Sequence, residues 1–103
     1  MRPYTLLTVL LIAAPVFGDE ARVEIREFRF IPDTITVSVG DSVRWVNREK
    51  RQYHSIRFEQ NGEPESPYLF PEESFTQRFD RPGRFAYRCG PHPEMTGVVE
   101  VTE

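Results

Sequence analysis

Apolar and polar residues alternate along most of the chain after residue 18, with a period of two. In the clearest run Ile35, Val37 and Val39 are separated by small residues that carry hydroxyl groups. A β-strand places alternate side chains on opposite faces, whereas the apolar positions of an amphipathic helix recur about every 3.6 residues. The pattern therefore predicts strands.

The alternation recurs in about seven short segments with turn residues between them, which is typical of a β-sandwich. The expected inward residues are Val23 and Ile25; Phe28 and Phe30, after a shift in parity that suggests a bulge; Ile35, Val37 and Val39; Val43 and Trp45; His54, Ile56 and Phe58; Phe75 and Phe79; Phe85, Tyr87 and Cys89; and Val99 and Val101. Irregular structure is expected at residues 48–53, 59–73 and 90–96. We therefore predict an all-β sandwich.

The first residues have the pattern of a secretory signal peptide. A single cation, Arg2, precedes an uncharged apolar run over residues 6–17, and Gly18 supplies a small residue at the cleavage position. The run is shorter than the about 20 residues that a membrane-spanning helix needs, so no membrane anchor is expected. We predict a signal peptide over residues 1–18, export with the periplasm as the expected compartment, and a single domain over residues 19–103.

The composition excludes two classes of small protein. The chain carries 13 Lys and Arg against 16 Asp and Glu, and its net charge of −3 argues against binding to nucleic acid. Cys89 is the one cysteine in the sequence, so no disulfide can form within the chain and a disulfide scaffold is excluded. An unpaired thiol in an oxidising compartment is reactive unless something occupies it.

Side chains that bind soft metals are few and lie mostly in one segment. After the predicted signal peptide they are His54, Cys89, His92 and Met95. Three of them fall within residues 89–95, directly after a strand whose inward parity ends at the cysteine. The fourth, His54, shares the inward parity of Ile56 and Phe58. All four side chains are therefore expected to converge at one end of the sandwich.

A thiolate, two imidazoles and a thioether are the ligand set of an electron-transfer copper site. The sulfur ligands stabilise Cu(I), while imidazole also suits Cu(II). Zinc competes for the same atoms, but it more often takes a fourth Cys, His or carboxylate than a thioether. Glu94 is near enough in the sequence to supply such a carboxylate. One copper ion is the expected cofactor, with zinc as the alternative.

The ligand segment resembles that of a known family. The residues concerned are Cys89-Gly90-Pro91-His92-Pro93-Glu94-Met95, with residues 83–88 before them, residues 96–101 after them, and residues 43–49 and His54 upstream. They resemble the cupredoxins, the type 1 blue copper proteins, and the short Cys-x-x-His-x-x-Met spacing is most similar to amicyanin-like and plastocyanin-like members. The resemblance implies a Greek-key β-sandwich of about seven to eight strands that binds one type 1 copper ion.

The resemblance also implies a role for each ligand. Cys89 would provide the electronic coupling, His54 the buried imidazole and Met95 a weak axial ligand. His92 would reach the surface through an apolar rim that includes Pro91 and Pro93, so that electrons enter and leave there.

The sequence departs from the family pattern around two ligands. The family typically has an Asn after the first His ligand, bonded to a hydroxyl residue after the Cys, and these positions hold Ser55 and Gly90. Tyr53 stands where Pro is usual, and Arg88 stands where plastocyanin has an exposed Tyr. We expect the residues that support the ligands to differ from those of the family.

These observations predict a carrier of single electrons that is not an enzyme. The two histidines and one cysteine leave no ligands for a second copper centre, and the Cys-x-x-Cys-His motif of c-type haem is missing from the sequence. A protein that delivers copper to others is the alternative, and a metal-free adhesion domain is a third interpretation.

The expected partners are redox proteins that dock near His92, and the chain itself is expected to be a monomer. Residues 59–73 are rich in glutamate, whereas residues 48–51 are basic. Solvated loops are the simpler interpretation of both charge clusters, and electrostatic steering of a redox partner is the sharper one.

Overall fold

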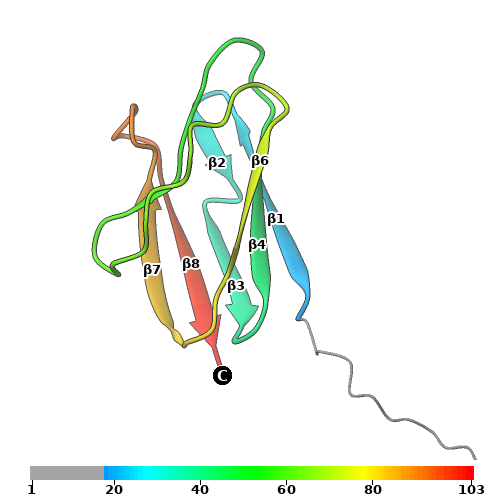
Figure 1. Cartoon of the computed structure of the whole chain (residues 1–103), viewed down its shortest axis with the longest axis vertical. Helices are drawn as coiled ribbons and strands as arrows, with labels where there is room; N and C mark the ends of the chain where they lie inside the picture. The colour runs from blue at the N-terminus through cyan, green and yellow to red at the C-terminus, as the bar shows by residue number, and fades with distance from the viewer. Residues whose placement is uncertain (1–17) are drawn as a thin grey trace, which may run out of the picture.

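The computed structural model describes residues 18–103, so the predicted signal peptide lies outside the described residues except for Gly18. The described part consists of strands joined by turns and loops (Figure 1). The strands are β1 (Glu20–Arg26), β2 (Arg29–Ile31), β3 (Thr34–Ser38), β4 (Ser42–Asn47), β5 (Arg57–Phe58), β6 (Ser74–Arg78), β7 (Gly83–Arg88) and β8 (Thr96–Thr102). This confirms the predicted all-β fold. Over residues 18–103 no helix is long and apolar enough to cross a membrane.

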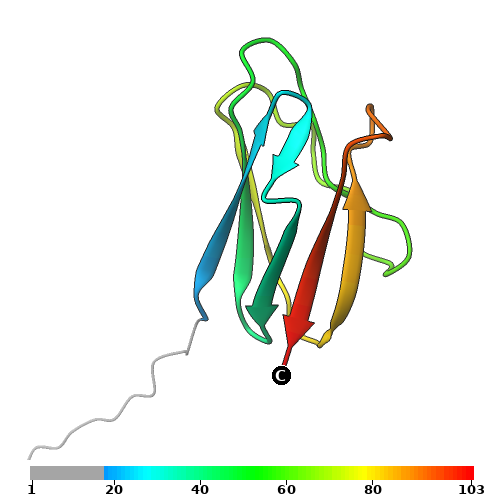
Figure 2. The same ribbon diagram turned by 180° about the vertical axis from the view of Figure 1, so that it is seen from behind.

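The strands form two four-stranded sheets, in the orders β2-β1-β4-β6 and β3-β8-β7-β5 (Figures 1 and 2). Each sheet contains one parallel pair, with Val23 opposite Trp45 in β1 and β4 and with Ile35 opposite Val99 in β3 and β8. Because β3 and β4 follow one another in the chain but lie in different sheets, the connection between them passes across the sandwich. This mixed arrangement agrees with the Greek-key sandwich that the family resemblance implies.

The core lies between the sheets and consists of the inward residues of both. Trp45 and Tyr87 face each other from opposite sheets with ring centroids 5.4 Å apart, and Phe79 packs edge-to-face on Phe85 at 5.1 Å. Burial of one such side chain stabilises the fold by about 1.5–3 kcal/mol. The core forms a rigid frame for the loops at its ends, because close-packed interiors deform little.

Two residues expected to face inward are exposed. Val39 lies beyond the end of β3 and is 39% exposed, because the chain turns there through Gly40. Phe28 is 42% exposed and forms, with Glu27, the two-residue turn between β1 and β2. Both turn residues have positive φ, 51° and 56°, as the tightest hairpin turns require. The shift in parity therefore marks a hairpin and not a bulge.

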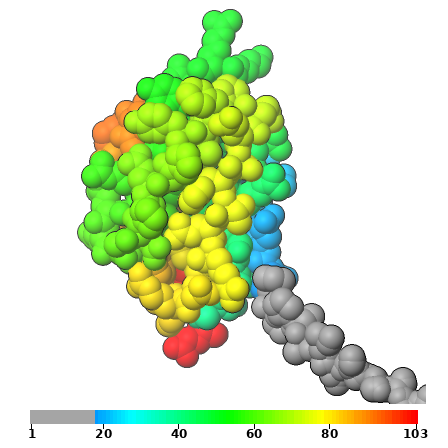
Figure 3. Space-filling model, in the orientation of Figure 1, coloured from blue at the N-terminus to red at the C-terminus, as the bar shows by residue number. Residues whose placement is uncertain are grey.

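Three connections meet at the end of the sandwich away from the C-terminus (Figures 1 and 2). They are the β1–β2 turn, the segment between β4 and β5, and the loop between β7 and β8. The long connection from β5 to β6, residues 59–73, runs over one face of the molecule (Figure 3). The predicted metal ligands lie within or beside these connections.

Candidate metal centre

Backbone hydrogen bonds to Leu69 fix the position of His54. It was expected to open a strand, but β5 is confined to Arg57–Phe58 and His54 forms an isolated antiparallel bridge with Leu69. Its N–H donates to Leu69 at 3.1 Å and its carbonyl accepts from the same residue at 2.8 Å. The buried Asn47 amide donates to the carbonyls of Gln52 and Leu69, at 2.8 and 2.9 Å. The backbone on both sides of the imidazole is thereby anchored.

The loop between β7 and β8 closes on itself. The Cys89 N–H donates to the carbonyl of Met95 at 3.0 Å, and the Met95 N–H donates to the carbonyl of His92 at 2.9 Å. Pro91 and Pro93 fix φ on either side of the histidine. The spacing of the three residues along the loop is thus set by short hydrogen bonds and by proline rings.

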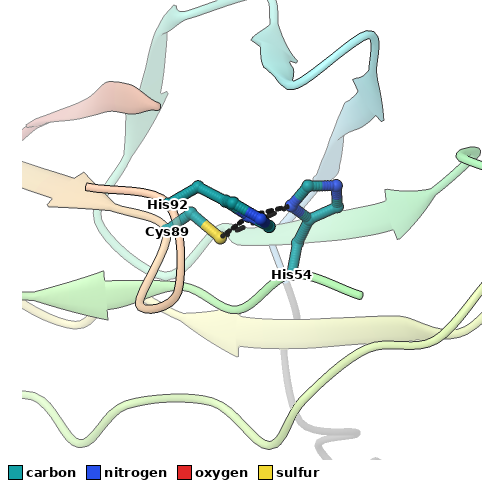
Figure 4. Close-up of side chains that lie close together, drawn as sticks. All are labelled: His54, Cys89 and His92. Carbon is teal, nitrogen blue, oxygen red and sulfur yellow. Dashed lines mark hydrogen bonds between the residues drawn. The ribbon is translucent and has the colours of Figure 1, made fainter. Parts of the chain in front are cut away.

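Three of the four predicted ligands point toward one another (Figure 4). The Cys89 sulfur lies 3.4 Å from Nδ1 of His54 and 3.6 Å from Nδ1 of His92, and the two nitrogens are 3.2 Å apart. Met95 is buried, belongs to the same core cluster as Cys89 and is joined to it by a backbone hydrogen bond. Residues far apart in the sequence are therefore gathered at one point, as their parity predicted.

These separations fit a single ion. Ligand atoms that each lie about 2.0–2.3 Å from one ion, at tetrahedral or trigonal angles, are about 3.3–3.8 Å apart. The separations of 3.4 and 3.6 Å lie within this range, and the separation of 3.2 Å between the two nitrogens lies just below it. Among residues 18–103, the His, Cys, Asp and Glu side chains that gather in this way are His54, Cys89 and His92. Glu94 is not among them, so the carboxylate that would have favoured zinc lies elsewhere.

Burial shifts the pKa values of two predicted ligands, Cys89 and His54. The pKa of the Cys89 thiol is raised because burial penalises the thiolate, and the Ser55 N–H that points at the sulfur from 3.4 Å only partly offsets this. The pKa of His54 is lowered because burial penalises the imidazolium. A neutral imidazole keeps its lone pair for a metal. A bound metal cation supplies the positive charge that stabilises a buried thiolate.

Glu49 and Phe28 contact the imidazoles, and neither was predicted from the sequence to lie at the metal centre. A carboxylate oxygen of Glu49 lies 3.3 Å from Nε2 of His54 and accepts the Phe28 N–H at 2.7 Å. The Phe28 ring meets both imidazoles edge-on, at 5.5 Å from His54 and 5.1 Å from His92. The carboxylate turns Nδ1 of His54 toward the sulfur, and the phenyl ring covers the rings from outside.

Arg88 contacts the loop between β7 and β8, and it occupies the position at which plastocyanin has an exposed tyrosine. Its guanidinium donates to the carbonyls of Cys89 and Gly90, at 2.9 and 3.0 Å, and to the carboxylate of Glu59 at 2.6 Å. This departure from the family pattern therefore replaces an aromatic surface group with an ion-paired cation that holds the ligand loop.

Comparison with known proteins agrees with this geometry. Residues 18–102 match the family model described as copper binding proteins of the plastocyanin/azurin family. The chain belongs to this family. Its cofactor is one type 1 copper ion, which the donor set and the spacing of the ligand atoms fit.

Relatives within the family include amicyanins and plastocyanins. The chain is 33% identical over 93 residues to amicyanin of Paracoccus denitrificans, which covers 86% of this chain and 70% of that protein. It is 37% identical over 80 residues to a chloroplastic plastocyanin of Tetradesmus obliquus, covering 68% and 54%. Among solved structures, a proline-to-glycine variant of amicyanin in its reduced Cu(I) form at pH 4 matches with a TM-score of 0.74 and 32% identity, covering 79% of this chain and 80% of that one.

Proposed function

We propose that this protein carries single electrons between redox partners, through a copper ion held by His54, Cys89, His92 and Met95. The observation that carries the proposal is the convergence of the Cys89 sulfur and two histidine nitrogens within 3.2–3.6 Å of one another. The relatives are named amicyanins and plastocyanins, and the structural match is to amicyanin in its Cu(I) form.

Bound copper supplies one-electron chemistry by alternating between Cu(I) and Cu(II). The chain contributes a site that changes little when the charge changes. His54 and Cys89 are buried, and their backbones are hydrogen-bonded to Leu69 and Met95, so they neither move freely nor contact water. A fixed, dry ligand frame lowers the reorganisation that accompanies electron transfer.

Electrons are proposed to enter and leave at His92. This histidine is half-buried, whereas His54, Cys89 and Met95 are buried, so it is the ligand with a face toward the surface. Pro93 beside it is exposed and offers an apolar contact to a docking protein. We propose a redox protein as the partner and a monomeric carrier.

The basic and acidic segments partly neutralise each other. Arg48, the first residue of the basic segment, pairs with Glu72 of the acidic one and lies 3.7 Å from Glu24. The exposed Lys50 and Arg51 remain as the cations that a partner could meet. Solvated, mutually compensating loops therefore stay the simpler interpretation, and steering of a partner would fall on these two residues.

The carrier role is proposed in place of an enzymatic one. The whole sequence holds two histidines and one cysteine, and all three gather at this centre. A copper oxidase or nitrite-reducing enzyme would need further histidines for a second copper centre.

We further propose export to the periplasm after cleavage behind Gly18. The N–H of Asp19 lies 2.9 Å from the carboxylate of Asp41, so a new, positively charged amino terminus at Asp19 would form an ion pair with that carboxylate. Mass spectrometry of the protein from a periplasmic extract should give a chain that begins at Asp19. A cytoplasmic chain that retains residues 1–18 would contradict export.

A redox titration tests the carrier role itself. The copper-loaded protein should take up and release one electron per copper reversibly, without loss of metal. Transfer of the copper to a chelator on reduction would instead indicate a delivery protein.

A further inference from the structure

One buried serine connects the two halves of the metal centre. The Ser55 hydroxyl donates to a carboxylate oxygen of Glu65 at 2.7 Å and accepts the Gly90 N–H at 3.0 Å. The Ser55 N–H points at the Cys89 sulfur from 3.4 Å. Because Ser55 follows His54 and Gly90 follows Cys89, these bonds tie the two ligand-bearing segments together.

Gly90 is explained by this contact and not by its backbone conformation. Its φ lies outside the left-handed region that favours glycine. A Cβ on Gly90 would collide with the carboxylate of Glu65 and would lie 2.6 Å from the Ser55 hydroxyl. A side chain of any kind at this position would therefore compete with the carboxylate for the same space.

The segment that carries Glu65 is held in place independently of these bonds. Ser66 pairs with Ile56 twice, since its hydroxyl accepts the Ile56 N–H and its own N–H donates to the Ile56 carbonyl, both at 2.9 Å. Ser66 and Ile56 are buried. Ser66 is therefore fixed beside Ile56, and this holds the neighbouring Glu65 within hydrogen-bond distance of Ser55.

We propose that Glu65 is a positioning residue of the metal centre, whose carboxylate holds the Ser55 hydroxyl in its bond to the Gly90 amide, and that residue 90 is glycine because this carboxylate occupies the space. These bonds take the place of the Asn-to-hydroxyl pair that the family resemblance implies at the same two positions. We call Ser55, Glu65 and Gly90 the Ser55 brace.

The Ser55 brace has an electrostatic consequence, which rests on the proposed function. Glu65 brings a negative charge to the hydroxyl that is bonded to the residue after Cys89. A nearby anion favours the more positive state of a bound metal ion. Glu65 therefore lowers the reduction potential of the centre, by stabilising Cu(II) relative to Cu(I).

Thermal unfolding of the metal-free protein tests the geometric part. Gly90→Ala should lower the Tm in the wild-type background and lower it by clearly less in the Glu65→Ala background, since no carboxylate is then displaced and Ser55 is free to turn. Equal losses of Tm in both backgrounds would overturn the proposed contact. Folding of the double variant when Gly90→Ala alone does not fold would also support it, and failure of both to fold would count against it.

The reduction potential of the copper-loaded protein tests the positioning role. Glu65→Gln keeps an oxygen that can accept the Ser55 hydroxyl, so it should leave the Tm of the metal-free protein nearly unchanged while it raises the potential. Glu63→Gln is the matched control, because Glu63 lies on the same segment but bonds to Gln77 and Arg81. A potential that Glu65→Gln leaves unchanged, or shifts no more than the control does, would overturn the role.

The two readouts separate this inference from the proposed function. A protein that fails to bind copper, or shows no redox cycle, would contradict the electron-carrier proposal, while the unfolding comparison on the metal-free protein would still decide whether Glu65 and Gly90 interact.

Discussion

The carboxylate of Glu49 lies 3.3 Å from Nε2 of His54, on the side of the imidazole that faces away from the Cys89 sulfur. This contact is buried, since the His54 side chain is fully enclosed and that of Glu49 is 13% exposed. Such a partner fixes the orientation of the ring and raises the basicity of the nitrogen that faces the metal.

Glu49→Ala should therefore weaken copper binding. The loss of a hydrogen-bonded carboxylate behind a ligating imidazole typically costs about 10–100-fold in metal affinity. Competition titration against a chelator measures the change. Glu72→Ala is the control, because Glu72 is an exposed glutamate that pairs with Arg48. Equal affinities for the two variants would show that Glu49 does not support the ligand.

Met95→Gln should keep copper and lower the reduction potential. The thioether is a soft ligand that stabilises Cu(I), whereas an amide oxygen is harder and favours Cu(II). Potentiometry of both proteins measures the shift, and Met95→Leu, which offers no ligand atom, should move the potential upward. If all three proteins had the same potential, Met95 would be a core residue and not a ligand.

The strand pattern was predictable from the sequence because burial alternates along most of the strands. The prediction of inward residues failed where the chain leaves the sheet, at Val39 and Phe28, because a turn changes the direction of a side chain without changing its hydrophobicity. The prediction that His54 opens a strand was wrong for a similar reason. Its inward direction was correct, but an isolated bridge to Leu69, a partner distant in the sequence, replaces the expected strand.

The gathering of three ligands was predictable because the chain has few soft side chains and their parity points inward. The residues that support them were not. Glu49 and Glu65 are two of many glutamates, and nothing in their local sequence distinguishes them. Their roles arise from contacts between distant segments, such as Glu65 with Ser55. The changed residues at positions 55 and 90 indicated a different support but not the carboxylate that supplies it.

The stability of the metal-free protein should depend on pH at both ends of the neutral range. The pKa of His54 is lowered from 6.5, so below this pH the unfolded chain binds a proton that the folded chain resists, and stability falls as the pH falls. The pKa of Cys89 is raised from 9.0, so above this pH the unfolded thiol ionises before the folded one, and stability falls as the pH rises.

Thermal unfolding across pH checks both signs. Stability should be greatest between these two values, and Cys89→Ala should flatten the alkaline side while leaving the acid side in place. An alkaline side that Cys89→Ala leaves unchanged would show that another group controls it.

Gly97→Ala should destabilise the fold. A Cβ at this position would collide with the ring and hydroxyl of Tyr87, which is buried in the core. Overpacking of this kind typically costs about 1–3 kcal/mol. Denaturant unfolding measures the loss, with the exposed neighbour Thr96→Ala as control. Equal stabilities of Gly97→Ala and the wild type would show that the strands can separate to make room.

The proposed centre holds one copper ion, bound by Cys89 and two imidazoles, that changes valence. The most direct test is the absorption and EPR spectrum of the copper-loaded wild type beside Cys89→Ser. The wild type should show an intense thiolate-to-copper band and a Cu(II) EPR signal, which disappear on reduction and return on oxidation, and Cys89→Ser should lack the band. A colourless wild type, or a band that survives in Cys89→Ser, would contradict the account.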